Sequence, residues 1–245
     1  MDTPDFPTLL SSITRCNAVY EPDDATARAA FAALGCTVLD RYSDADAQAV
    51  AIITPAGRQE LVIAGTRASE GSLLERLCDV NEDVLELFTP LYLGGGAAVA
   101  TGGHHRAAEI WRWAAPLFSQ DRPVDVTGHS LGGVATHAML AVMPPSWIGD
   151  LIAWEPPKAA NARYWQQFGG ALARCLTVVH GRDWWAAYPW ISTGLEHLTH
   201  PPGPMLWLHD GAWEWVTRDS WPGGLITHMG DHDTTAVMAA VQGLV

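Results

Sequence analysis

The sequence predicts an α/β protein in which a central, mostly parallel sheet is flanked by helices. Strand-like apolar runs alternate with helical stretches along the chain. One of these runs, Val124–Thr127, passes directly into Gly128–Gly132 and then into a helix rich in Ala, Met and Val. A Gly-x-Ser-x-Gly between a strand and a helix is typical of the nucleophile elbow of the α/β-hydrolase fold, with Ser130 at its tip. Glycines flank the serine because its strained backbone leaves no room for neighbouring Cβ atoms.

The composition is typical of one globular domain. The 245 residues are 48% hydrophobic and 17% charged, with a net charge of −13. This negative charge argues against nucleic acid as a ligand and against electrostatic binding to anionic membranes. We expect a single domain over residues 1–245. Residues 1–48 would form an N-terminal helical extension and first strand, and the core would begin at about residue 50.

The N-terminal residues and the cysteines give information on where in the cell the protein is located. Met1–Asp5 carries acidic residues where a secretory signal has Lys or Arg, and no apolar run is long enough to cross a membrane. We therefore expect a soluble protein that is cytoplasmic or exported by another route. Cysteines 16, 36, 78 and 175 lack metal-ligand spacing and are expected to be free buried thiols.

Two helices and three strands are expected before the elbow region. The first helix is capped by Asp2–Pro4 and carries apolar residues 6, 9, 10 and 13 on one face; the second ends at Gly35. Strands are expected over residues 37–41, 49–54 and 60–65, the last two joined by a turn. Residues 67–88 have helical propensity. Glycines 94–96 and 102–103 indicate a loose loop before a helix at His104–Phe118.

After the elbow, helices again alternate with strands. Helices are expected at 131–143, 159–168 and about 232–244, and strands at 151–154 and 176–180. Residues 184–204 are expected to be irregular, and a hairpin around Asp210-Gly211 follows. This alternation predicts a largely parallel sheet of the doubly wound kind.

A nucleophilic serine needs an imidazole to remove its proton and a carboxylate to orient that imidazole. In α/β-hydrolases these partners follow the serine in the order acid, then base. Asp183, shortly after the strand at 176–180, is the preferred acid, and Glu155, directly after the strand at 151–154, is the alternative. His232 is the preferred base and His228 its nearest competitor.

The oxyanion of a tetrahedral intermediate needs backbone donors. One donor is usually the N–H of the residue after the serine, here Leu131. Thr66 follows the expected strand at 60–65 and offers a second N–H and a hydroxyl.

The chain resembles the fungal-type class 3 lipase family. Gly128–Gly133 reproduces the family's G-H-S-L-G-G elbow, and Gly65-Thr66 is similar to its oxyanion loop. The family's next helical segment is similar to Leu74–Val80. Its stretch with the catalytic acid resembles His180–Asp183, and its D-H pair resembles Asp231-His232. The similarity extends from about residue 50 to the C-terminus. It departs at Ala64, where the family usually has Arg or Lys.

The resemblance also implies a lid. Gly71–Leu77 would form a short amphipathic helix over the acyl groove, with Leu73, Leu74 and Leu77 on one face and Gly71 as a hinge. Alternatively, these leucines belong to a surface helix packed on the sheet. Seven tryptophans lie between the acid and the base, and either fill the core or line an acyl site.

These observations predict a serine carboxylester hydrolase that cleaves lipid or other apolar acyl esters through an acyl-enzyme. Its catalytic residues are Ser130, Asp183 and His232, and we expect no cofactor and no metal. The expected partners are ester substrates and a transient lipid interface, without stable membrane insertion; oligomeric state stays open. The alternatives are an acyltransferase that uses the same acyl-enzyme and a non-catalytic protein of the same fold.

Overall fold

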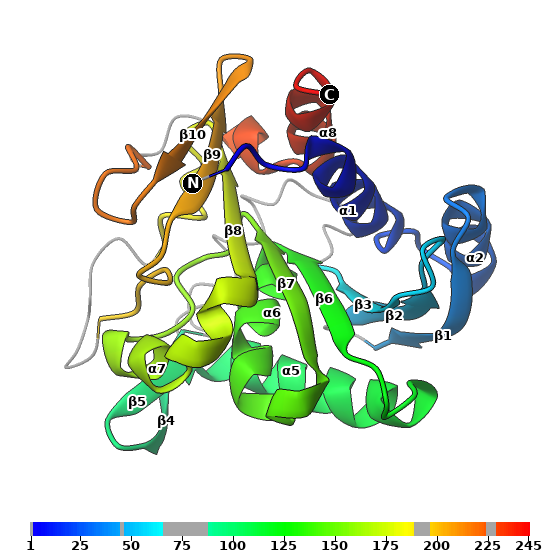
Figure 1. The fold of residues 1–245 in the computed structure, drawn as a ribbon, viewed down its shortest axis with the longest axis horizontal. Coiled ribbons are helices and arrows are strands. Elements are labelled where there is room, and N and C mark those ends of the chain that lie inside the picture. The colour runs from blue at the N-terminus through cyan, green and yellow to red at the C-terminus, as the bar shows by residue number, and fades with distance from the viewer. Residues whose placement is uncertain (1, 45–46, 66–87, 189–196, 224–228) are drawn as a thin grey trace.

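A computed structural model describes residues 2–44, 47–65, 88–188, 197–223 and 229–245. Its main feature is an eight-stranded sheet with the order β1-β2-β3-β6-β7-β8-β9-β10, accompanied by a small β4-β5 hairpin (Figure 1). The strands are β1 (Thr37–Ser43), β2 (Gln48–Ile53), β3 (Gln59–Ile63), β4 (Pro90–Gly94), β5 (Ala97–Ala100), β6 (Val124–His129), β7 (Ile148–Trp154), β8 (Cys175–His180), β9 (Met205–His209) and β10 (Ala212–Val216).

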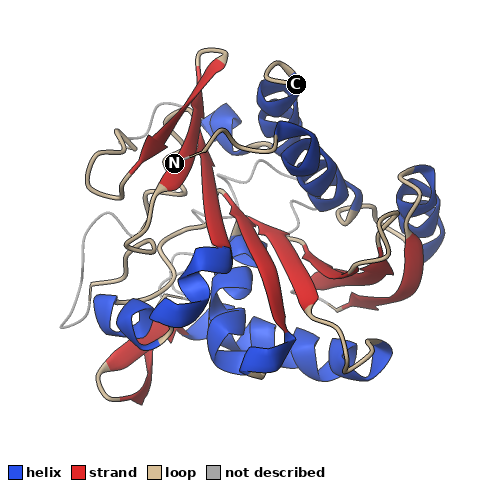
Figure 2. Ribbon diagram, in the orientation of Figure 1, coloured by secondary structure: helices blue, strands red, loops and turns tan. Residues whose placement is uncertain are grey.

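Helices cover both faces of this sheet (Figure 2). The α-helices are α1 (Phe6–Ala18), α2 (Asp24–Ala33), α5 (Thr101–Ala114), α6 (Leu131–Val142), α7 (Ala162–Gln167) and α8 (Thr234–Gln242). Short 3-10 turns are η1 (Ala115–Leu117), η2 (Pro145–Trp147), η3 (Gly169–Arg174) and η4 (Met229–His232). None of the described helices has the length and apolar character needed to cross a membrane.

The predicted α/β-hydrolase fold, with a mostly parallel sheet between helices, is confirmed. Strands β3, β6, β7, β8 and β9 are parallel, and β1-β2-β3 and β9-β10 add antiparallel edges. The parallel strands follow chain order, without the reversal of a doubly wound sheet. Right-handed crossovers that always step in one direction place their helices on one face, where α5, α6 and α7 lie. The first and last helices, α1 and α8, cover the other face (Figure 1).

The structure corrects the loose loop expected around two glycine groups. Gly94–Gly96 forms the tight turn of the β4-β5 hairpin, with positive φ at all three glycines. Gly102 and Gly103 lie in the first turn of α5. A Cβ atom on Gly103 would lie 2.4 Å from Val134 Cγ1, so this glycine lets α5 pack closely against α6. The N-cap of α1 is Asp5, rather than a residue of Asp2–Pro4.

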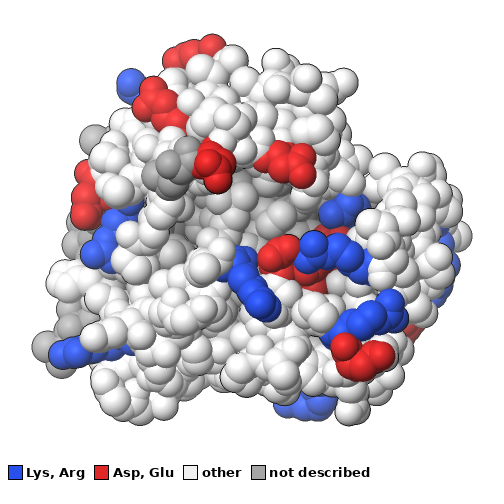
Figure 3. Space-filling model, viewed as in Figure 1, with Lys and Arg blue, Asp and Glu red and all other residues white. Residues whose placement is uncertain are grey.

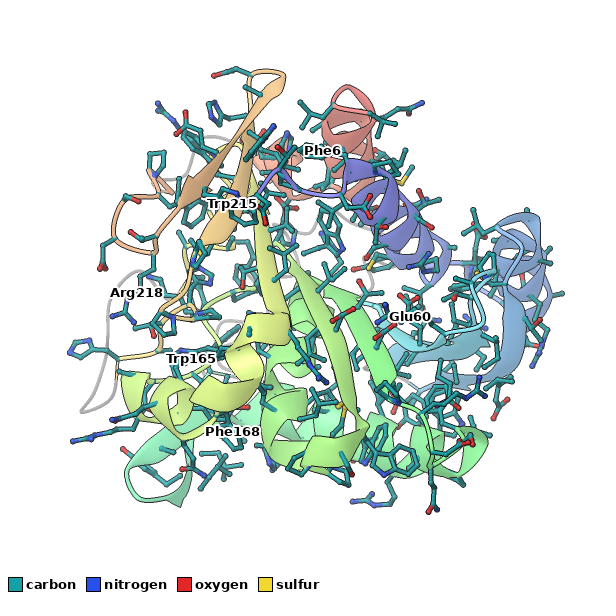
Figure 4. All side chains as sticks on the ribbon, viewed as in Figure 1. Phe6, Glu60, Trp165, Phe168, Trp215 and Arg218 are labelled. Atoms are coloured by element: carbon teal, nitrogen blue, oxygen red, sulfur yellow. The ribbon has the colours of Figure 1, made fainter. Side chains whose placement is uncertain are left out.

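Helix α1 is joined to the middle of the sheet by buried polar contacts. Ser12 Oγ accepts a hydrogen bond from Trp154 Nε1 (3.1 Å) and lies 2.8 Å from Thr127 Oγ1. Arg15 forms a buried ion pair with Glu60 on β3 at 2.9 Å (Figure 4). The N-terminal helix is therefore part of the packed core, and it holds the turn that follows it against β3 and β6.

The charges on the surface are mixed. On the face drawn in Figure 3, both acidic and basic side chains are present and most of the surface is uncharged. Among the cysteines in the described ranges, Cys16, Cys36 and Cys175 are free thiols, and burial raises the pKa of the Cys16 thiol to about 12. Cys16 and Cys36 are buried as expected, whereas Cys175 is half-buried against the core.

The burial of Glu60 predicts that the free energy of unfolding depends on pH. Burial raises the pKa of this carboxyl group from 4.5 to about 7, despite the opposing charge of Arg15. Between these pH values the folded chain keeps a proton that the unfolded chain has lost, so the stability contribution falls as the pH rises. We expect the free energy of unfolding of the wild type, relative to Glu60→Gln, to fall by about 3 kcal/mol from about pH 4 to about pH 8.

Urea denaturation of both proteins at the two pH values measures this difference. Burial lowers the pKa of His137 to about 3, so this histidine and others like it make the free energy of unfolding rise with pH. This effect is the same in both proteins and cancels in the difference between them. A difference that stays constant across this pH range would contradict the assignment.

Candidate active site

Ser130 stands at the junction of β6 and α6 in a strained conformation. Its φ of 59° and ψ of −125° lie in a region that non-glycine residues rarely adopt. Its neighbours explain how the strain is accommodated. A Cβ atom at Gly128 would lie 2.3 Å from the carbonyl oxygen of Gly132, and one at Gly132 would lie 2.3 Å from that of Ile63. The two glycines of the motif are therefore steric requirements of this turn.

Ser130, His232 and Asp183 form a continuous hydrogen-bonded chain. Ser130 Oγ lies 2.8 Å from His232 Nε2, and His232 Nδ1 lies 2.7 Å from Asp183 Oδ2. With Nδ1–H donating to the carboxyl group, Nε2 is free to accept the serine proton. All three side chains are at least 95% buried, so these contacts are little screened by water.

Each partner is held by its own turn. Asp183 follows β8, and its carboxyl group also accepts hydrogen bonds from the backbone N–H groups of Trp185 (2.9 Å) and Ala186 (3.2 Å). His232 ends the short η4 turn, two residues before α8 begins. These turns come from distant parts of the chain and meet at the carboxyl ends of the parallel strands.

A second hydrogen-bonded chain joins four segments around the serine. The Gly65 N–H donates to Tyr20 Oη (2.7 Å), and Tyr20 Oη–H donates to His129 Nδ1 (2.8 Å). His129 Nε2–H then donates to the carbonyl oxygen of His232 (2.9 Å). Burial lowers the pKa of His129 well below its usual value, so the ring is neutral and takes this single tautomer. The chain fixes the positions of the elbow, the base and the end of β3 relative to one another.

Glu155, the alternative acid, lies in the same site. It directly follows β7, has a φ of 47° and is fully buried. Its Oε2 atom is 3.8 Å from His232 Nδ1, against 2.7 Å for Asp183 Oδ2. The nearer carboxyl group, that of Asp183, is the hydrogen-bond partner of the imidazole.

The site does not fit a metal ion. Ligand atoms of His129, Glu155 and His232 lie within 4.8 Å of one another, which is close enough for a metal centre. However, both ring nitrogens of each histidine already have hydrogen-bond partners within the protein. The chemistry of this cluster is therefore proton transfer rather than metal coordination.

Several predicted residues fall outside the described ranges: Thr66, Leu73, Leu74, Leu77 and the competing histidine, His228. Their assigned roles stay predictions. Leu131, the other expected oxyanion donor, is the first residue of α6, where a backbone N–H has no acceptor within the helix. Gly65, the residue before Thr66, packs against Ser130, since a Cβ on this glycine would lie 2.7 Å from Ser130 Cβ.

The sequence analysis missed the roles of Tyr20 and His129. His129 is the variable second residue of the elbow motif, and its position beside Ser130 was a signal. Tyr20 lies 109 residues before His129, so no local pattern could have indicated this contact. Of the tryptophans between acid and base, Trp184 and Trp185 are buried in the core, and Trp185 stacks on Tyr188. These two tryptophans fill the core.

Comparison with known proteins gives structural neighbours only. No protein-family model matches the chain, and no curated protein sequence matches it significantly. Its structure is similar to lipase II from Rhizopus niveus (TM-score 0.64, 16% identity, 92% of this chain and 93% of that chain). It is also similar to the Rhizomucor miehei triacylglyceride lipase (0.63, 16%, 94% of each chain). A third neighbour is the Lip2 lipase from Yarrowia lipolytica (0.63, 15%, 85% and 80%). At these identities the likeness shows the fold.

The close packing of the elbow predicts that one added methyl group lowers the stability of the protein strongly. Gly132→Ala places a methyl group against two carbonyl oxygens, at 2.3 Å from Ile63 O and 2.7 Å from Ala64 O. Relief requires backbone movement, so we expect a loss of about 3 kcal/mol in the free energy of unfolding. Urea denaturation measures the loss. Gly170→Ala, where a Cβ meets nothing within 4 Å, is the matched control and should change stability little. Equal stabilities of the two variants would contradict this steric account.

Proposed function

We propose that this protein is a serine carboxylester hydrolase in which Ser130 is the nucleophile, His232 the general base and Asp183 the group that orients His232. The observation that carries the proposal is the unbroken series Ser130–His232–Asp183, with contacts of 2.8 and 2.7 Å, at a strained elbow. This geometry supplies what a serine lacks as a nucleophile, a base within hydrogen-bond reach.

The reaction follows from the positions of these groups. His232 Nε2 takes the proton of Ser130 Oγ as the oxygen attacks the ester carbonyl, and the resulting imidazolium donates to Asp183. Collapse of the tetrahedral intermediate transfers that proton to the leaving alcohol and leaves an acyl-serine. Water, activated by His232 in the same way, then releases the acid and regenerates Ser130.

The oxyanion is bound by the backbone N–H of Leu131 and by Thr66. The support for Leu131 is its position at the N-terminus of α6, which also places the positive end of the helix dipole at the reacting carbonyl. The support for Thr66 is the packing of its neighbour Gly65 against Ser130. Removal of one such donor costs about 10²–10³-fold in kcat in serine hydrolases.

We assign lipid or other apolar acyl esters as the substrate class. The support is the family resemblance of the elbow, together with the names of the structural neighbours, which are lipases from three fungi. The leucines proposed for the lid and acyl groove, residues 73, 74 and 77, belong to this same hypothesis.

The nucleophile is tested by Ser130→Ala. Without the hydroxyl no acyl-enzyme can form, so hydrolysis of a p-nitrophenyl ester should fall by about 10⁴-fold or more, and fluorophosphonate labelling should disappear. Ser146→Ala, at an exposed serine of η2, is the control and should behave like the wild type. Near-wild-type hydrolysis by Ser130→Ala would refute the proposal.

The base is tested by comparing two histidine variants. His232→Ala removes the ring that lies 2.8 Å from Ser130 Oγ and should abolish turnover, whereas His228→Ala should retain it. Steady-state rates on the same ester give the answer. If His228→Ala is the inactive variant, the roles of the two histidines are exchanged.

A further inference from the structure

Glu155 is a buried carboxyl group to which the mechanism above gives no role. Its side chain is fully buried, and the donor it faces in the described part of the chain, the backbone N–H of His180, lies outside good hydrogen-bonding geometry with either carboxyl oxygen. A buried polar group without a well-formed hydrogen bond destabilises the folded protein, and more so when the group is charged. A glutamate at this position therefore lowers the stability of the fold. The groups around its carboxyl group indicate its role.

Glu155 lies beside the histidines of the proposed active site. Its Oε2 atom lies 3.8 Å from His232 Nδ1 and 3.5 Å from His129 Nε2. The edge of the His232 imidazole that carries Nδ1 thus faces two carboxyl groups, one from the end of β7 and one from the turn after β8. The positive charge that His232 acquires during catalysis develops between them.

We propose that Glu155 is a second acid of this active site, a positioning residue that shares with Asp183 the orientation of His232 and the stabilisation of its imidazolium form. This inference rests on the proposed function. Asp183 holds Nδ1–H in the resting protein. Glu155 lies about 1 Å beyond hydrogen-bond distance, so a small shift of either side chain closes the gap.

The charge state of Glu155 sets when it can act. Burial is the largest cause that raises its pKa well above the usual value, and the charges of Asp183, Asp231 and Asp233 act in the same direction. The backbone N–H of His180 opposes them, and His129, His232 and the neutral Tyr20 hydroxyl are the other titratable groups around it. The carboxyl group therefore keeps its proton to a higher pH than an exposed glutamate does, and its ionised fraction grows as the pH rises. Loss of the Asp183 charge lowers the pH at which it ionises.

This arrangement is tested by removing the two carboxyl groups separately and together. Asp183→Ala leaves Nδ1 of His232 facing Glu155 alone, and we expect kcat/KM on a p-nitrophenyl ester to fall by about 10²-fold at alkaline pH. Asp183→Ala with Glu155→Gln should fall by about 10⁴-fold, the loss typical of a triad without its acid. The ratio between the two variants should grow as the pH rises, because only one of them gains a carboxylate.

Glu155→Gln alone mimics the neutral carboxyl group. It should match the wild type at acidic and neutral pH and fall several-fold behind it at alkaline pH. Glu60→Gln is the matched control, because Glu60 is also a buried glutamate with a raised pKa but faces Arg15 rather than a histidine. At pH values where both proteins are fully folded, its activity ratio to the wild type should not depend on pH.

The result that overturns the inference is equal activity of Asp183→Ala with and without Glu155→Gln at every pH. Asp183→Asn, which keeps the shape of the side chain and one acceptor oxygen for either the Trp185 or the Ala186 amide, repeats the comparison if the alanine variant does not fold. If neither folds, a pH-independent ratio of wild type to Glu155→Gln overturns it. Ser130→Ala separates the two proposals: high activity there refutes the function, whereas its inactivity beside a failed Glu155 test refutes only the second acid.

Discussion

The backbone of Ser130 is the constraint on which the rest of the site depends. A non-glycine residue at a φ of 59° costs about 1–3 kcal/mol and persists only where its surroundings enforce it. Here the enforcement is steric and local: Gly128 and Gly132 let the end of β6 and the start of α6 approach within contact of β3. This close approach places the serine hydroxyl at the carboxyl edge of the sheet, where turns from distant parts of the chain converge.

Hydrogen bonds between neutral groups hold these turns together around Ser130. Tyr20 comes from the turn after α1, Gly65 from the end of β3 and His129 from the elbow, and their chain ends on the backbone of His232. Because the His129 ring is neutral, it joins these segments without placing a second positive charge beside the base. The turn after helix α1 is thus linked to the backbone of His232 by hydrogen bonds.

Two carboxyl groups, which follow the adjacent strands β7 and β8, face the imidazole of His232. The structure distinguishes Asp183 from Glu155 by their hydrogen-bond partners: three donors face Asp183, whereas Glu155 has none within hydrogen-bonding geometry. Burial, and after it the charge of Asp183, raises the pKa of Glu155 well above its usual value. Asp183 is therefore the hydrogen-bond partner of His232, and Glu155 is a second carboxyl group beside the same nitrogen.

The sequence by itself determined the fold class and the position of the elbow at Ser130, because both follow from local patterns. The apolar run before Ser130, the flanking glycines and the helix after it are consecutive, so their steric logic could be read directly. The sequence also placed Asp183 and Glu155 after neighbouring strands, but it could only rank them. Which carboxyl group reaches His232 depends on distances of 2.7 and 3.8 Å that follow from the register of β7 and β8. The contacts of Tyr20 and Arg15 with the sheet, and the one-sided placement of α5, α6 and α7, were likewise decided by tertiary packing, since these partners are far apart in the chain.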